Sequence, residues 1–371
     1  MVTESAAGPA DLANSNNWTD HVTWLAPLVG WGLLATTLKV AVSPLILAAV
    51  LVATVLAAVH HAEVIAHKVG EPFGTFLLAI AVTIIELGLI VTLMSAGGES
   101  AATLARDTVF AAVMIILNGL LGICFLVGAL KHHEQSFQQT GASASLATLS
   151  VLTVSTLVLP NFTSSAGGPT YSPSQLAFVA VVSFLLYVTF VSVQTVRHRD
   201  YFLPSEAVVS NEDVHAAPPS NQQTVFSSIL LLACLGAVVL LAKALSKPIE
   251  GSVLSAGAPL AFVGVIIAAL VLLPEGMAAV RAALGNRLQT SLNLGLGSAL
   301  ATIGLTIPGV AALSLFAGMP ITLGLDNKST VLLFLTLLVA TSSLATGRTT
   351  VLHGAMHLMI LGLYLFTAIV P

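Results

Sequence analysis

The sequence predicts an all-α polytopic membrane protein with about 11 transmembrane helices, arranged as one leading helix and two sets of five with inverted topology. Hydrophobic residues make up 56% of the 371-residue chain and charged residues only 8%, whereas a soluble domain carries about 25% charged residues. The apolar runs are long and continuous rather than short and alternating, which excludes a membrane β-barrel. A long polar segment after the sixth run divides the chain into two parts.

Glycine, proline and charged residues interrupt the apolar runs and set the helix boundaries in chain order. The expected spans are residues 22–38, 43–68, 74–97, 106–130, 143–159, 174–196, 224–244, 256–283, 288–316, 329–345 and 351–370. Apart from the long polar segment, the breaks between them read KVAV, VGEPF, GESAATLA, KHHEQSFQQTGA, PNFTSSAGGPTYSP, LSKPIEGSVLS, LGNR, AGMPITLGLDNK and TGRTT.

The long polar segment, residues 197–223, reads RHRDYFLPSEAVVSNEDVHAAPPSNQQ and is interpreted as a linker. It separates an N-terminal tail and leading helix (1–40) and a first five-helix repeat (41–196) from a second five-helix repeat (224–371). Because five is odd, two sets that share a fold must enter the membrane in opposite directions.

The basic residues favour one orientation. Seven of the twelve Lys and Arg residues fall on the side of the N-terminus and linker, namely Lys68, Lys131, Arg197, Arg199, Arg281, Arg287 and Arg348. The other five are Lys39, Arg106, Lys243, Lys247 and Lys328. The positive-inside rule then predicts that the N-terminus and linker are cytoplasmic and the C-terminus is outside.

Two acids lie deep within apolar helices, each in the second helix of its set of five. Glu86 lies in AVTIIELGLIVTLM and Glu275 in LVLLPEGMAAV. A carboxylate at the bilayer centre costs roughly 2.5 kcal/mol or more, so it must be neutralised by a proton, a cation or a basic partner. No Lys or Arg lies deep in any predicted span. The pair therefore indicates a site for protons and metal cations, although a protonated, purely structural glutamate is the alternative for each one alone.

Further oxygen ligands are predicted near the two acids. Pro274 has no N–H, so the carbonyl of Leu270 loses its helical partner and becomes a ligand for a hard cation. An ordinary proline kink is the alternative. In the next helix, Asn293 and Ser298 are the favoured ligands, and Asn118 is the one buried amide of the equivalent helix in the first half.

The remaining polar residues of that helix have a more general interpretation. Ser298, Thr302 and Thr306 recur every four residues and so share one helix face. For Thr302 and Thr306 we expect hydrogen-bonding between helices rather than cation binding.

Histidines form two further groups. The segment HHAEVIAHKVGEPFG carries His60, His61, Glu63, His67 and Glu71, which could act as a pH sensor or a weak metal-binding patch. We favour the simpler interpretation of an interfacial helix end. His353 and His357 lie four residues apart in the last helix, and without a third ligand the pattern favours packing over metal binding.

Several function classes lack support. The chain has no Cys/His spacing typical of zinc, no P-loop and no nucleotide-binding glycine motif, so neither an enzyme nor a bound cofactor is expected. The net charge of −4 gives no reason to expect nucleic acid as a partner. Cys124 and Cys234 are far apart, each within an apolar run, and a disulfide between them is not expected.

Four blocks together resemble the ChaA-type branch of the calcium/cation antiporter superfamily. They read HHAEVIAHKVGEPFGT, VTIIE, RDTVFAAVMIILNG and LPEGMAAVRAALGNRLQTSLNLGLGSALATIGLTIP. The resemblance covers most of the chain. It implies an inverted-repeat exchanger of the bacterial inner membrane that moves Ca²⁺, Na⁺ or K⁺ outward in return for protons.

The resemblance also assigns roles to residues. Glu86 and Glu275 match the two essential acids of the exchanger repeats, Asn118 falls near a first-repeat amide, and Ser298 falls in the GS motif. Thr83 and Leu272 stand where Ca²⁺/H⁺ exchangers usually have asparagine, which removes two amide ligands and leaves the choice between Ca²⁺ and a monovalent cation open. Thr83 is kept as a candidate binding residue, which makes seven with Glu86, Glu275, Asn118, Ser298, Asn293 and Leu270.

The expected function is secondary antiport by alternating access, with Glu86 and Glu275 taking up a proton or a cation in turn. The expected partners are inorganic cations, protons and the lipid bilayer, and a homo-oligomer is left open. A cation channel or uniporter with an acid-lined pore is the main alternative. A non-transporting membrane scaffold is the other.

Overall fold

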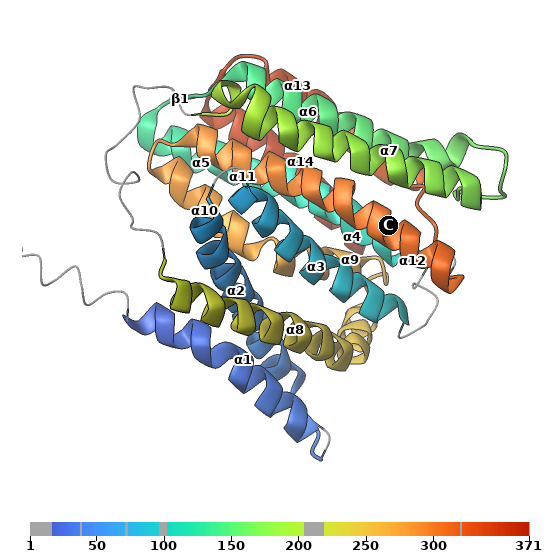
Figure 1. The fold of residues 1–371 in the computed structure, drawn as a ribbon. Coiled ribbons are helices and arrows are strands. Elements are labelled where there is room, and N and C mark those ends of the chain that lie inside the picture. The colour runs from blue at the N-terminus through green and yellow to red at the C-terminus, as the bar shows by residue number, and fades with distance from the viewer. Residues whose placement is uncertain are drawn as a thin grey trace, which may run out of the picture.

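The computed structural model describes residues 17–37, 39–70, 73–95, 102–203, 219–319 and 321–370, and these residues form a bundle of long helices (Figure 1). The first half contains α1 (Asn17–Thr37), α2 (Pro44–Val69), α3 (Phe73–Ser95), α4 (Leu104–Met114), α5 (Leu121–His132), α6 (Gln139–Thr153) and α7 (Pro173–Ser192). The second half contains α8 (Asn221–Ser255), α9 (Phe262–Val271), α10 (Leu273–Leu284), α11 (Leu288–Ala301), α12 (Ile307–Ala317), α13 (Asn327–Leu344) and α14 (Val351–Ile369).

Several of these helices join end to end through wider or tighter turns. The π-helical turns are η1 (Ile115–Leu120) between α4 and α5, η2 (Val154–Val158) after α6, η4 (Val193–Arg197) after α7, and η7 (Thr302–Thr306) between α11 and α12. The turns η3 (Leu159–Phe162) and η5 (Arg199–Tyr201) are 3₁₀-helical. Both η1 and η7 interrupt the third helix of a predicted set of five. This shared interruption supports the prediction that the two halves are structural repeats.

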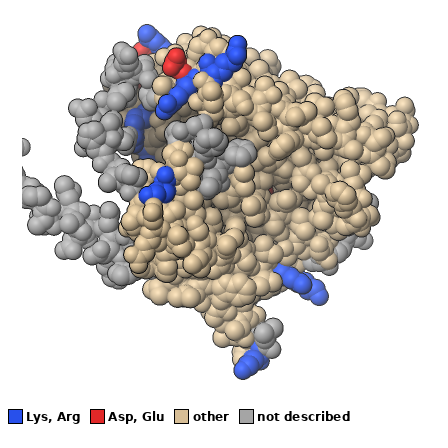
Figure 2. All heavy atoms as spheres, in the orientation of Figure 1, with Lys and Arg blue, Asp and Glu red and all other residues tan. Residues whose placement is uncertain are grey.

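The helices are suited to a membrane. Among the described residues, eight helical segments are long and apolar enough to cross a bilayer, or nine if the bent pair α9 and α10 is one span. Figure 2 shows charged side chains at the upper left and lower right of the molecule, with a broad face between them that carries none. The helical multi-pass fold is therefore confirmed, while the number of 11 spans and the repeat boundaries stay predictions.

Two spans differ from their expected form. Helix α8 continues to Ser255 through Pro248, although residue 244 was the expected end. Lys243 and Lys247 lie on its exposed face. Because their charged groups are not buried, the helix can continue past its apolar part. The expected span 256–283 is broken at Leu272 into α9 and α10, which meet at a bend of 58°. Pro274 is the second residue of α10, in the first turn, where a missing N–H costs no helical hydrogen bond.

Three helices form a layer along one side of the bundle. Helices α2 and α8, the first helices of the two sets of five, pack against each other, and α1 packs on both (Figure 1). The buried His61 links the three helices, because its Nδ1 lies 3.3 Å from Ser227 Oγ and its Nε2 lies 3.3 Å from the Thr23 carbonyl oxygen. For His61 the structure thus shows a packing role. Glu71 lies outside the described residues.

Contacts at both ends of the bundle join the remaining helices of the first half to those of the second half. At the linker end, the two-residue strands β1 (Gln135–Ser136) and β2 (Arg348–Thr349) pair antiparallel. Gln135 also donates from Nε2 to the Ala283 carbonyl, at 2.9 Å.

At the opposite end, residues 321–326 of the loop between α12 and α13 bind the first half. The Thr322, Gly324 and Leu325 amides donate to the carbonyls of Ala102, Pro169 and Leu157, at 2.8, 2.9 and 2.8 Å. These backbone bonds join the two halves where α4 begins.

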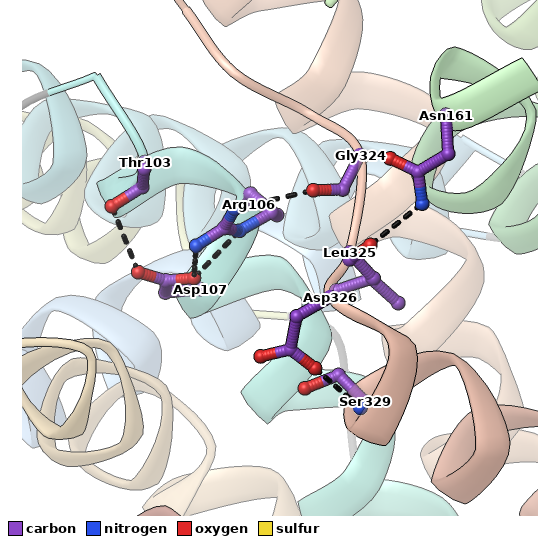
Figure 3. Close-up of polar contacts among 8 residues, drawn as sticks. All are labelled: Thr103, Arg106, Asp107, Asn161, Gly324, Leu325, Asp326 and Ser329. Atoms are coloured by element: carbon purple, nitrogen blue, oxygen red, sulfur yellow. Dashed lines mark hydrogen bonds and ion pairs between the residues drawn. The ribbon is translucent and has the colours of Figure 1, made fainter. Parts of the chain in front are cut away.

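Side chains reinforce the same loop (Figure 3). Arg106 Nη1 donates to the Gly324 carbonyl at 3.1 Å, and Asn161 Nδ2 donates to the Leu325 carbonyl at 2.6 Å. Arg106 is itself held by an ion pair of 2.7 Å with Asp107, which also accepts a hydrogen bond from Thr103. We call residues 321–326 the clamped loop.

Candidate cation site

Glu86 and Glu275 line one cavity of about 150 Å³, which we call the glutamate cavity. Its wall also includes Thr83, Asn293 and Ser298, so five of the seven predicted site residues are brought together. Helices α3 and α7 of the first half and α10 and α11 of the second half contribute to it. The site is thus built across the two halves of the chain.

Glu86 lies in the middle of α3 and is 3% exposed. Thr306 Oγ1 donates a hydrogen bond of 3.0 Å to Glu86 Oε2. Thr306 ends the π-helical turn η7, and Thr302, which begins that turn, lines the cavity. Such turns occur in helices at functional sites because they displace side chains from regular helical positions.

Glu275 lies in the first turn of α10, directly after the break in the helix. Free backbone N–H groups in a first turn favour negative charge there. One carboxyl oxygen, Oε2, is buried and has no hydrogen-bond partner among the described residues. A buried oxygen left in this way carries an unfavourable desolvation cost, which a bound proton or cation would remove.

The two glutamates line the same small cavity, so the charge of one acts on the other. Within the described part of the chain, neither forms an ion pair with a lysine or arginine. Two like charges in a buried site oppose each other's ionisation. A cation or a proton is therefore the available source of compensating charge.

The glutamate cavity extends toward the linker end of the bundle. Gln194 and Thr195, in the turn that ends α7, belong to its wall together with Ala79 near the start of α3. Asn293 lies on the same side, where its Nδ2 donates to the Phe202 carbonyl at 2.6 Å. In this conformation the route from the glutamates leads to the linker side.

Two of the predicted ligands do not line the cavity. Leu270 lies two residues before the break at Leu272 and packs on the apolar core. Asn118 points to α13 and α14: its Nδ2 donates to Thr336 Oγ1 at 2.9 Å, and its Oδ1 lies 3.3 Å from His357 Nδ1. His357 Nε2 in turn lies 3.2 Å from Ser343 Oγ.

This second polar group is fully buried and fully satisfied. Asn118, Thr336, Ser343 and His357 are each 0% exposed. Satisfied networks of this kind fix the packing of the elements that they join. His357 therefore packs between helices, and it holds the Asn118 amide by one hydrogen bond.

Thr306 forms the hydrogen bond between helices that the sequence led us to expect, since its hydroxyl in η7 donates to Glu86 on α3. The sequence did not indicate that the partner would be one of the two acids.

The Thr306 hydroxyl gives a direct test. A hydrogen bond to a charged group contributes about 1.5–3 kcal/mol, so Thr306→Val should weaken apparent cation affinity by roughly 10-fold or more. Thr306→Ser keeps the O–H and should retain affinity close to that of the wild type. The measurement is the cation concentration that gives half-maximal flux in proteoliposomes. Wild-type affinity in Thr306→Val would show that the contact does not matter.

The fold is that of a multi-pass helical membrane protein, in which each half of the chain contributes one acid to the same cavity. Residues 39–196 and 226–370 match the family described as sodium/calcium exchanger protein. The chain belongs to this family, whose members are secondary transporters and not enzymes.

Individual relatives agree with the family. The chain is 48% identical to "Putative ionic transporter y4hA" of Sinorhizobium fredii, over 94% of this chain and 96% of that protein. It is 35% identical to "Sodium-potassium/proton antiporter ChaA" of Escherichia coli, over 92% of this chain and 93% of that protein. Among solved structures, native YfkE matches with a TM-score of 0.72 at 19% identity, covering 94% of this chain and 100% of that one.

Proposed function

We propose that the protein exchanges Ca²⁺, Na⁺ or K⁺ for H⁺ at the glutamate cavity. The observation that carries this proposal is the meeting of Glu86 and Glu275, from the two halves, in one cavity where the described residues supply no basic partner. The family match and the sodium-potassium/proton antiporter relative support it.

Competition for the same carboxylates couples the two fluxes. A cation in the cavity favours the ionised glutamates, and protonation of the glutamates releases the cation. Since a bare pair of buried carboxylates is unfavourable, the site would change its exposure only when it is occupied. Alternating access then converts this competition into exchange.

The proposal includes a location. We infer a bacterial inner membrane, with the N-terminus and linker in the cytoplasm, from the bias of Lys and Arg toward that side. The glutamate cavity would then face the cytoplasm in the conformation described.

The test is flux in proteoliposomes that contain a pH-sensitive dye. With the membrane potential clamped, we add Na⁺, K⁺ or Ca²⁺ separately outside liposomes whose interior starts at a higher pH than the medium. At least one cation should drive proton exit and interior alkalinisation, and should do so even against the proton gradient. A channel would move the cation without moving protons uphill, and absence of proton movement with all three cations would contradict the proposal.

A further inference from the structure

The linker begins with a short stretch that is bound into the helix bundle. Residues 198–203 follow the π-helical turn η4 and contain the 3₁₀ turn η5, and we call them the linker anchor. Within the anchor, Phe202 is 4% exposed, although the residues on either side of it are exposed. Phe202 contacts two residues of the glutamate-cavity wall, Asn293 and Phe190.

A chain of hydrogen bonds joins the anchor to the second half. Asn293 Nδ2 donates to the Phe202 carbonyl at 2.6 Å, and Asn293 Oδ1 accepts from Gln289 Nε2 at 3.0 Å. Gln289 is itself buried, and its Oε1 accepts from the amide of Gln138, directly before α6, at 2.7 Å. Both ends of the Asn293 amide are therefore held, and Phe202 and Gln289 together set its orientation in the cavity wall.

Apolar contacts hold the Phe202 ring. It meets Phe190 on α7 edge to face, with ring centroids 5.9 Å apart and an interplanar angle of 88°, an arrangement that aromatic pairs prefer. A Cβ at Gly141 on α6 would clash with the Tyr201 carbonyl oxygen and lie 3.2 Å from Phe202 Cδ1. Glycine at this position thus leaves the room that the anchor occupies, and the buried ring fixes the position of its own carbonyl.

These contacts place the anchor at the mouth of the glutamate cavity. Gln194 and Thr195, in the turn just before the anchor, line the cavity on the linker side. Helix α6 packs on both α7 and α11 (Figure 1), and the anchor contacts all three helices. It therefore joins a wall residue of the first half, Phe190, to a wall residue of the second half, Asn293.

A loop end that packs only for stability is the simpler interpretation of the anchor. Two features of Asn293 favour a role in binding. The partner of the Phe202 carbonyl is a side chain of the cavity wall, and that side chain is held at its other end as well. An amide oxygen has two lone pairs, so Asn293 Oδ1 keeps a second acceptor position, and a group already held in place costs less to order when a ligand binds.

We propose that Phe202 is a positioning residue for the linker-side mouth of the glutamate cavity. Its carbonyl and its ring hold Asn293 and Phe190, so that a cation entering from the linker face meets an amide that is already oriented. The ligand is the transported inorganic cation. This inference rests on the proposed antiport and adds the start of the linker to the residues that set its affinity.

The test loosens the anchor in two independent ways. Phe202→Ala removes the buried ring, and Gly141→Ala displaces the anchor from α6 through the added Cβ. Phe178→Ala, at a side chain 69% exposed on α7, is the control for the first variant. Gly251→Ala on α8, where a Cβ meets nothing within 4 Å, is the control for the second.

Exchange is measured against cation concentration in membrane vesicles from a host that lacks its own cation/proton antiporters. Everted vesicles present the proposed cytoplasmic face, which carries the linker, and right-side-out vesicles present the other face. Both anchor variants should raise the half-saturating cation concentration at the linker face by roughly 3- to 10-fold, the effect of one hydrogen bond. The maximal rate, and the half-saturating concentration at the other face, should stay within about twofold of the wild type.

A double variant identifies the path of the effect. If Phe202 acts through Asn293, then Phe202→Ala adds little to Asn293→Ala, because residues that share one interaction are not additive. The conservative Phe202→Leu keeps a buried apolar side chain and should restore most of the affinity. Melting temperatures in detergent establish that each variant is folded.

Three outcomes overturn the positioning role. They are an unchanged half-saturating concentration in a folded anchor variant, equal losses at both faces with a reduced maximal rate, and effects of Phe202→Ala and Asn293→Ala that multiply in the double variant. Because exchange by the unsubstituted protein is measured first, failure of the antiport itself is recognised separately.

Discussion

Glu275→Gln and Glu86→Gln proteins insert and fold but lose cation/proton exchange by roughly 30-fold or more. The expected loss follows from removing the negative charge that the glutamate places beside the bound cation. Removing one partner of a buried pair of opposite charges costs about 2–5 kcal/mol, and each ~1.4 kcal/mol changes affinity tenfold. Glutamine keeps the size and the carbonyl oxygen of glutamate, but it neither binds a proton near neutral pH nor supplies a negative charge to a cation. Each variant is measured by proton flux in proteoliposomes.

A surface glutamate provides the matched control. Glu134 is exposed and forms a 3.0 Å ion pair with Arg348 at the linker end, and exposed pairs contribute little. Glu134→Gln should therefore insert, fold and exchange at the wild-type rate. Monodisperse purified protein and an unchanged melting temperature establish that the cavity variants are folded. Substantial exchange by either cavity variant would contradict the two-glutamate mechanism.

Gly324→Ala strongly destabilises the protein. A Cβ at this position would clash with the side-chain oxygen of Asn161 and lie 2.7 Å from Pro169 Cβ, while the backbone is held in place by bonds to Pro169 and Arg106. Relief requires Asn161 to move, which breaks its bond to the Leu325 carbonyl. Overpacking of this kind costs about 1–3 kcal/mol, which corresponds to a fall of several degrees in melting temperature.

The measurement is the thermal unfolding of purified protein in detergent, and Gly362→Ala is its control. Gly362 lies within α14, and a Cβ there meets nothing within 4 Å. Since alanine is the better helix former, this control should leave the melting temperature unchanged or raise it. Equal melting temperatures for Gly324→Ala and the wild type would show that the clamped loop rearranges around the added Cβ with no loss of stability.

The sequence was informative wherever the chemistry is local. Apolar runs with their interruptions predicted a helix at every expected span, and Pro274 marked the place where α9 and α10 separate. The end of α8 was missed because Lys243 and Lys247 suggested a boundary, although polar exposed residues are compatible with a helix that continues. Boundaries of this kind depend on the surroundings and not on the residues alone.

The site was predictable to the extent that a charged residue within an apolar run can be recognised from the sequence. Glu86 and Glu275 were identified in this way, and the structure places them in one cavity. The environment of Asn118 was not predictable, because its partners Thr336 and His357 lie on helices more than 200 residues away. The partner of Thr306 was not predictable for the same reason, since its contact with Glu86 spans 220 residues.

The buried Asn118 network has a consequence for biosynthesis. Chains are made from the N-terminus onward, and the histidine that faces Asn118 comes 239 residues later, in the last helix. Until α14 enters the membrane, this amide lacks one of its final partners. The polar contacts of the first half are thus completed only by α14, and a nascent chain interrupted before that helix leaves the buried Asn118 amide without this hydrogen-bond partner.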